Sequence, residues 1–158
     1  MATQTAAAAP SIDVTTMRRV AIESPCKGRV PRFIPRLFAP LVERVGRQIN
    51  HIYAVRCMRD ALQRGEAPYA SHVLFDGAGV LDDSDPVQRA LGINCGYQWS
   101  SLATLHVFYL DLGWSHGMLE AWDRCKRRGW DTEIRYINPR RQAEAEERAA
   151  RDVSKVEA

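Results

Sequence analysis

The sequence lacks any closely spaced pair of cysteines, because its four cysteines, Cys26, Cys57, Cys95 and Cys125, are scattered along the chain. This spacing is typical neither of a zinc ribbon nor of the disulfide framework of a small secreted protein. The sequence also lacks an apolar run long enough for a signal peptide or a membrane span. We therefore expect a soluble, cytoplasmic protein without membrane association.

Charge of one sign is not in large excess, because the formal net charge is only +3. The arginines are unevenly placed, however, and five of them crowd one segment: Arg29, Arg32, Arg36, Arg44 and Arg47. Such a cluster favours phosphate or acidic partners, although most charge runs simply face solvent. Aromatic residues do not alternate with the arginines, so we expect no direct binding to nucleic acid.

Length and composition predict a single globular domain, because 158 residues of ordinary hydrophobicity suffice for one core. We predict a disordered leader over residues 1–17, one α/β nucleotide-binding-like domain over 18–138, and a charged C-terminal helix or tail over 139–158. A basic, proline-rich insertion at residues 29–47 interrupts the domain. Its apolar side chains predict a lid over a crevice, a contact between subunits, or a loop that covers the core.

The hydropathy pattern within the domain alternates strands with helices. Apolar or alternating runs predict strands at residues 20–22, 68–75, 104–110 and 130–137, the last half exposed near a sheet edge. Three- and four-residue spacing predicts helices at 48–64, 86–100 and 118–128, with Asp85 as a cap and Gln88 returning its bond. His106 is expected to be an interior histidine with its hydrogen bonds satisfied. The order predicts an open, mainly parallel sheet flanked by helices, flavodoxin-like or Rossmann-like.

Three loops leave the carboxyl ends of the predicted strands, where open parallel sheets bind their ligands. They comprise residues 23–28, the stretch from His72 through the acidic loop at 82–85, and residues 111–118. The backbone amides near Ser115 begin a helix, and unpaired amides at a helix start favour an anion such as phosphate. We therefore expect a small-ligand crevice at this edge.

Two residue types in these loops allow more than one interpretation. The acidic loop could offer oxygen ligands to a metal ion, but capping and solvated roles are more typical of its spacing, and we predict no metal site. Cys26 beside Lys27 could be a nucleophilic thiol, although a free cysteine is more commonly a small buried apolar residue.

The chain resembles an uncharacterised phage and bacterial family related to the nucleoside 2-deoxyribosyltransferases. The resemblance lies in three runs, which read IESPCKG, CMRDALQRGEAPYASHVLFDGAGVLDDSDPVQRALGI and YLDLGWSHGMLEAWDRCKRRG. It covers most of the chain from Val20 to Tyr136. It implies the sheet described above, a nucleoside or nucleotide as ligand, no cofactor, and a homo-oligomer whose neighbouring subunits complete each other's sites.

Enzymes of that superfamily cleave or exchange an N-glycosidic bond with a glutamate on the helix after the glycine loop. Counted back from Cys125, the position of that glutamate falls on Ala121, and Glu120 lies one residue earlier. The resemblance implies Glu120 as nucleophile, provided the helix start is shifted, and Asp111 as its carboxylate partner. The implied ligand-binding residues are Ser24, Pro25, Cys26, Gly28, His72, Asp83, Gly113, Ser115, His116, Gly117 and Met118.

Two functions remain open at this point. One is a nucleotide N-glycosidase or deoxyribosyltransferase acting on a nucleoside monophosphate. The other is a non-catalytic module of the same fold that binds or senses a nucleotide, which Ala121 favours. A structural adaptor using residues 33–45 as its contact surface leaves the glycine loops unexplained. Both nucleotide hypotheses require the turns near residues 24, 72 and 115 to meet in one hollow.

Overall fold

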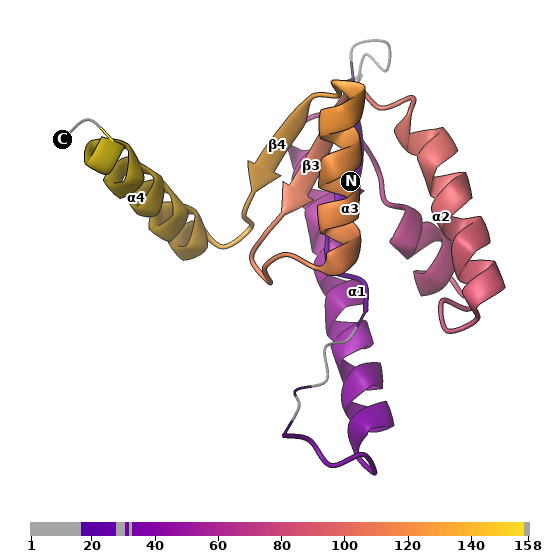
Figure 1. Ribbon diagram of the computed structural model, residues 1–158. Coiled ribbons are helices and arrows are strands. Elements are labelled where there is room, and N and C mark those ends of the chain that lie inside the picture. Colours follow the sequence, from indigo (N-terminus) through magenta and orange to yellow (C-terminus); the bar gives the residue numbers. More distant parts are fainter. Residues whose placement is uncertain (1–16, 28–30, 32, 157–158) are drawn as a thin grey trace, which may run out of the picture.

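The computed structural model describes residues 17–27, 31 and 33–156. One parallel sheet has the strand order β2-β1-β3-β4, with β1 at Arg19–Glu23, β2 at Ala67–Tyr69, β3 at Leu105–Tyr109 and β4 at Thr132–Arg135. The helices are α1 (Ala39–Gln63), the short π-helix η1 (Val73–Gly77), α2 (Pro86–Ser100), α3 (His116–Arg128) and α4 (Pro139–Val156). Helix α1 covers one face of the sheet, whereas α3 and α2 lie on the other side (Figure 1). The predicted open parallel sheet flanked by helices is confirmed.

The core consists of two apolar layers, one on each face of the sheet. Alternating residues of the central strands pack against α1, among them Val20, Ile22, Leu105 and Val107. On the other face Phe108 packs against Met118, Ala121 and Cys125 of α3. Every side chain of β3 is buried, which is why its residues other than His106 are apolar or aromatic and do not alternate with polar ones. This arrangement fixes the carboxyl ends of β1 and β3 side by side.

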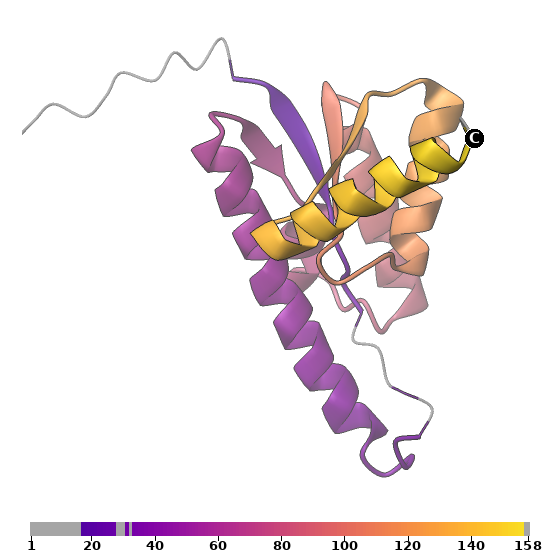
Figure 2. The ribbon, with the colours of Figure 1, turned by 90° about the vertical axis from the view of Figure 1, so that its left-hand side faces the viewer.

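Helix α1 begins at Ala39, so the prediction of a start at residue 48 is wrong. Pro40 lies in the first turn, where a fixed φ angle and a missing N–H do not interrupt a helix. Residues 39–47 of the predicted insertion are therefore helical, and this part of α1 extends beyond the sheet (Figure 2). Residues 28–30 and 32 of the insertion lie outside the described residues, as does the predicted leader apart from Met17.

The strand predicted at residues 68–75 is wrong beyond Tyr69. Strand β2 pairs with only three residues of β1, after which the chain turns at the buried Ala70 and its carbonyl accepts hydrogen bonds from the amides of Val73 and Leu74. Gly77 closes the segment against α1, because a Cβ at this position would lie 2.3 Å from ring atoms of His51. The apolar run 73–75 therefore forms η1 at the sheet edge instead of continuing β2.

Helix α2 starts as predicted, with Asp85 as its cap. The carboxylate of Asp85 accepts hydrogen bonds from the amides of Val87, at 2.8 Å, and Gln88, at 3.1 Å. The side chain of Gln88 does not bond back to the cap residue as predicted. Its Oε1 instead accepts a hydrogen bond from the amide of Asp82 at 2.9 Å. The acidic loop is thereby folded against the start of α2.

The edge strand β4 is half exposed, as its alternation predicts, but its buried side chain is charged. Arg135 is 5% exposed and donates to both carboxylate oxygens of Glu66, at 2.6 and 2.7 Å, whereas Ile134 is 44% exposed. His106 stacks on Trp130 with ring centroids 4.7 Å apart, and its buried Nε2 has no hydrogen-bond partner within the described residues. The expectation that His106 is fully satisfied is therefore wrong.

Beyond β4 the chain continues as the charged helix α4, which leads away from the sheet (Figure 1). Within the described residues, no helix combines the length and the apolar character that crossing a membrane would require.

Candidate functional site

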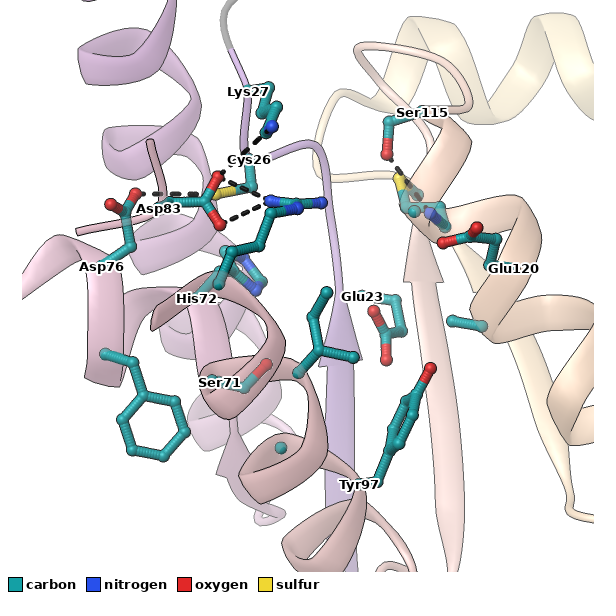
Figure 3. A pocket seen from close by; sticks show the side chains of 18 of the residues that line it. Glu23, Cys26, Lys27, Ser71, His72, Asp76, Asp83, Tyr97, Ser115 and Glu120 are labelled. Carbon is teal, nitrogen blue, oxygen red and sulfur yellow. Dashed lines mark hydrogen bonds and ion pairs between the residues drawn. The ribbon is translucent and has the colours of Figure 1, made fainter. Parts of the chain in front are cut away.

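A cavity of about 430 Å³ lies at the carboxyl edge of the sheet, between the turns after β1, β2 and β3 (Figure 3). The turns near Ser24, His72 and Ser115 meet there as predicted. The remaining wall is the inner face of α2, which presents small residues at four-residue spacing. The lining residues are Glu23, Ser24, Cys26, Lys27, Ser71, His72, Phe75, Asp76, Leu81, Asp83, Gln88, Arg89, Gly92, Ile93, Gly96, Tyr97, Ser100, Ser115, His116, Gly117, Met118, Glu120, Ala121 and Arg124.

The turn after β1 is held in place from both sides. Asn50 of α1 donates to the carbonyl oxygens of Cys26, at 3.3 Å, and Lys27, at 2.8 Å. On the cavity side, Ser24 Oγ and His72 Nε2 share a hydrogen bond of 2.8 Å. Burial, with the neighbouring His51 adding to it, lowers the pKa of His72 to about 4. The imidazole is therefore neutral at physiological pH and links the first two turns without adding charge.

Glu23 ends β1 and places a carboxyl group in the middle of the cavity (Figure 3). Burial raises its pKa to about 7, although the positive charge of Arg124 partly opposes this effect. A substantial fraction of Glu23 is therefore protonated at neutral pH, so that it can act as a hydrogen-bond donor and an acid. The guanidinium carbon Cζ of Arg124 lies 3.4 Å from the ring centroid of Tyr97, and this cation–π contact holds the guanidinium at the cavity wall.

Cys26 lies in surroundings that suppress a thiolate. Its Sγ donates a hydrogen bond to Asp76 Oδ2 at 3.6 Å. Burial, followed by the negative charges of Asp76 and Asp83, raises the pKa of Cys26 to about 12. Because the thiolate is the nucleophilic form, Cys26 is a hydrogen-bond donor in this cavity and not an activated nucleophile.

The acidic loop contributes Asp83 to the cavity as part of an ion pair. Arg89 Nη1 donates to both carboxylate oxygens of Asp83, at 2.5 and 2.6 Å, and Lys27 Nζ lies 3.9 Å from the same carboxylate. Asp82 accepts from the amide and hydroxyl of Ser84. These contacts, with the cap at the start of α2, account for the acidic loop as a structural element.

The third turn begins α3, whose first residues face the cavity. Ser115 caps the helix by accepting from the amide of Met118 at 3.3 Å. A Cβ at Gly117 would meet nothing within 4 Å, so this residue borders open space. Glu120 lies at the rim with its side chain 58% exposed and 3.5 Å from His116 Nδ1. Ala121 is 6% exposed and takes the inner position.

The cavity contains most of the residues that the sequence assigned to a site. Of those, the ones that line it are Ser24, Cys26, His72, Asp83, Ser115, His116, Gly117, Met118 and Glu120. Pro25, Gly113 and Asp111 are not among the lining residues, and Gly28 lies outside the described residues. The Asp111 carboxylate is engaged elsewhere, because it accepts from the Tyr53 hydroxyl at 2.6 Å and from the amides of Ile137 and Asn138 at 2.9 and 2.7 Å. These bonds tie β3 to α1 and to the start of α4.

Several polar lining residues were given no role from the sequence, among them Glu23, Arg89, Tyr97 and Arg124. Helical spacing contained part of the missing signal. Gly117, Ala121 and Arg124 fall on one face of α3 at steps of four and three, so a site at Gly117 implies Ala121 one turn further on and Arg124 two turns further on. Gly92 and Gly96 mark the inner face of α2 in the same way, and Tyr97 adjoins it. No comparable pattern singles out Glu23.

The fold and the cavity together define an open parallel α/β protein with a ligand-sized hollow at the carboxyl edge of its sheet. A family model described as a domain of unknown function, DUF7768, matches residues 18–137, and the chain belongs to that family. No curated protein and no solved structure matches the chain significantly. Nothing in these comparisons links the family to the nucleoside 2-deoxyribosyltransferases, so that resemblance stays a prediction.

Proposed function

We propose that the cavity binds a nucleoside 5′-monophosphate and that the protein cleaves the N-glycosidic bond of this ligand. The observation that supports the proposal best is the meeting of three turns, near Ser24, His72 and Ser115, in one cavity at the carboxyl edge of the sheet. Open parallel sheets bind nucleotides at this place. The volume of about 430 Å³ lies within the roughly 300–1,000 Å³ of small-molecule sites.

Opposite walls of the cavity suit different parts of a nucleotide. The start of α3 offers backbone amides beside the open space at Gly117, and the positive end of a helix favours phosphate. Lys27, whose ammonium group lies 3.9 Å from the Asp83 carboxylate, adds a positive charge at the turn after β1. Phe75, Ile93 and Tyr97 line the cavity with apolar and aromatic surface, which suits the flat faces of a base.

Glu120 is the proposed nucleophile. Its carboxylate lies at the cavity rim one turn from the proposed phosphate position, and a carboxylate near the sugar carbon C1′ can stabilise the positive charge that develops there as the base departs, or attack this carbon. His116, at 3.5 Å, limits the directions in which this carboxylate can point. A shift of Glu120 toward the inner position of Ala121 is required for direct attack.

Base release from nucleoside 5′-monophosphates, followed by chromatography, tests this proposal. We expect Glu120→Gln to lower base release by at least about 1,000-fold, as for other catalytic nucleophiles, while nucleotides still raise the Tm of the variant. Asp123→Asn is the matched control, because Asp123 is exposed on the same helix and does not line the cavity. Turnover retained in Glu120→Gln would remove Glu120 from the mechanism.

A second function, nucleotide binding without turnover, is favoured by Ala121. This residue holds the inner position on α3 that the resemblance assigns to the catalytic glutamate, and it has no functional group. This alternative predicts that a nucleoside monophosphate raises the Tm of the wild-type protein while no member of the panel releases free base.

A further inference from the structure

Glu23 is a cavity carboxyl group for which the described residues provide no hydrogen-bond or salt-bridge partner, although the charge of Arg124 acts on it. Within the described part of the chain it forms no hydrogen bond and no salt bridge, although it ends the central strand β1 and lines the cavity. Glu23 is partly buried and lines the cavity, and withdrawing a carboxyl group from bulk water costs free energy, which structures usually offset with hydrogen bonds or an opposite charge in contact. The position is therefore one that a ligand completes.

The other carboxyl groups near the cavity are already engaged. Asp76 accepts from the Cys26 thiol, Asp83 binds Arg89, and Asp111 accepts from two amides and a hydroxyl outside the cavity. Glu120 is more than half exposed at the rim. Among these groups Glu23 alone combines an inner position with a carboxyl free to contact the ligand.

We propose that Glu23 is the acid that protonates the departing base, an inference that rests on the proposed cleavage of a nucleotide N-glycosidic bond. Tyr97 borders the cavity beside Glu23, so a base placed against Tyr97 lies next to this carboxyl group (Figure 3). The raised pKa of about 7 supplies the protonated form near neutral pH. Two carboxyl groups with different surroundings are the arrangement that divides acid from nucleophile in glycoside cleavage.

The proposed step balances within the cavity. The C1′–N bond breaks and its electron pair passes to the base nitrogen, which receives the proton from the Glu23 carboxyl group. A carboxylate oxygen of Glu120 forms the new bond to C1′. Water then attacks C1′, the Glu23 carboxylate accepts a proton from that water, and Glu120 leaves as a carboxylate. Arg124 stabilises the ionised Glu23 between the two steps through its positive charge.

The test compares leaving groups that need a proton with leaving groups that do not. The first substrate is the unmodified nucleoside 5′-monophosphate that the wild-type protein cleaves fastest. The second set comprises 7-methylguanosine 5′-monophosphate and nicotinamide mononucleotide, whose bases carry a positive charge and depart without protonation. Wild type, Glu23→Gln and Glu120→Gln are compared on each, and circular dichroism verifies folding.

In the first turnover, measured with the protein in excess over the nucleotide, base release reports only the first step. There we expect Glu23→Gln to lower release of the unmodified base by at least about 100-fold and release of the charged bases by less than about threefold, because general acid catalysis affects only the former. Wild-type cleavage of the unmodified nucleotide should fall above pH of about 7, and the residual activity of Glu23→Gln should lack this fall. Glu120→Gln should impair both substrate types.

Equal effects of Glu23→Gln on base release in the first turnover of the two substrate types, or no effect on either, would overturn the role of Glu23 as acid and leave the proposed function standing. Absence of base release from every nucleotide by the wild-type protein would overturn the proposed function and this inference together.

Discussion

Replacing Glu23 by Gln tests the electrostatics of the cavity without any ligand. The pKa of Glu23 rises from 4.5 to about 7 on folding, so between these pH values the folded chain holds a proton that the unfolded chain has lost. Linkage then requires the free energy of unfolding to fall as pH rises through this window. The displacement of the pKa corresponds to about 3 kcal/mol. Gln cannot ionise and does not lose this stability.

We therefore expect the stability of Glu23→Gln, relative to wild type, to increase by about 3 kcal/mol between pH 4.5 and pH 8.5. Urea denaturation followed by circular dichroism at a series of pH values measures this difference. A difference in the free energy of unfolding that is the same at both ends of the range would refute the reasoning, because it would mean that Glu23 titrates equally in the folded and unfolded chain.

The comparison between variant and wild type is essential, because a second cavity residue hides the effect in the wild-type curve. Burial lowers the pKa of His72 from 6.5 to about 4, so its contribution to stability is present above pH 6.5 and is lost as pH falls toward 4. Glu23 and His72 therefore give opposite slopes over much of the same range. Subtracting the two curves removes His72, which is common to both proteins.

Two further predictions concern the phosphate position and the edge of the sheet. Gly117→Ala should raise the free energy of unfolding by up to about 1 kcal/mol, because alanine favours the helix and its Cβ meets no protein atom. If phosphate binds beside Gly117, the same substitution should weaken the binding of a nucleoside monophosphate, measured by calorimetry, at least about tenfold. Unchanged affinity would place the phosphate elsewhere in the cavity. Arg135→Met should lower the free energy of unfolding, measured by urea denaturation, by about 3–5 kcal/mol, because it leaves the buried Glu66 carboxylate without its ion-pair partner. The double variant with Glu66→Leu should recover much of this loss, and no recovery would contradict the ion-pair argument.

The sheet could be predicted because its main elements depend on local patterns. The continuous apolar run of β3, the alternation of β4 and the cap at Asp85 are each determined by a few neighbouring residues. The strand predicted at residues 68–75 was wrong beyond Tyr69 because partners distant in sequence decide the conformation of this segment. Strand β1 pairs with only three of its residues, and Gly77 packs against His51. Pro40 marked a loop in sequence but a first helical turn in the structure.

The candidate site could likewise be predicted from the sequence only in part. Ser24, His72 and Ser115 could be found because the ends of parallel strands share one edge of the sheet. Asp111 also follows a strand, but Tyr53 and the start of α4 draw its carboxylate away from the cavity. Glu23 was missed because it is distinguished by having no hydrogen-bond or salt-bridge partner among the described residues. Only the folded structure shows which side chains surround it.

The hollow at the sheet edge is shared between segments that are distant in the chain, from the turn after β1 to the first turn of α3. No contiguous fragment of moderate length contains all of its walls. Partial unfolding that frees α3 would remove Ala121 and Arg124 from the cavity together with the start of the helix, even if β1, β2 and α1 stayed associated. A bound ligand would consequently behave as a cross-link between the two halves of the chain, and its release would accompany the first separation of those halves rather than complete unfolding.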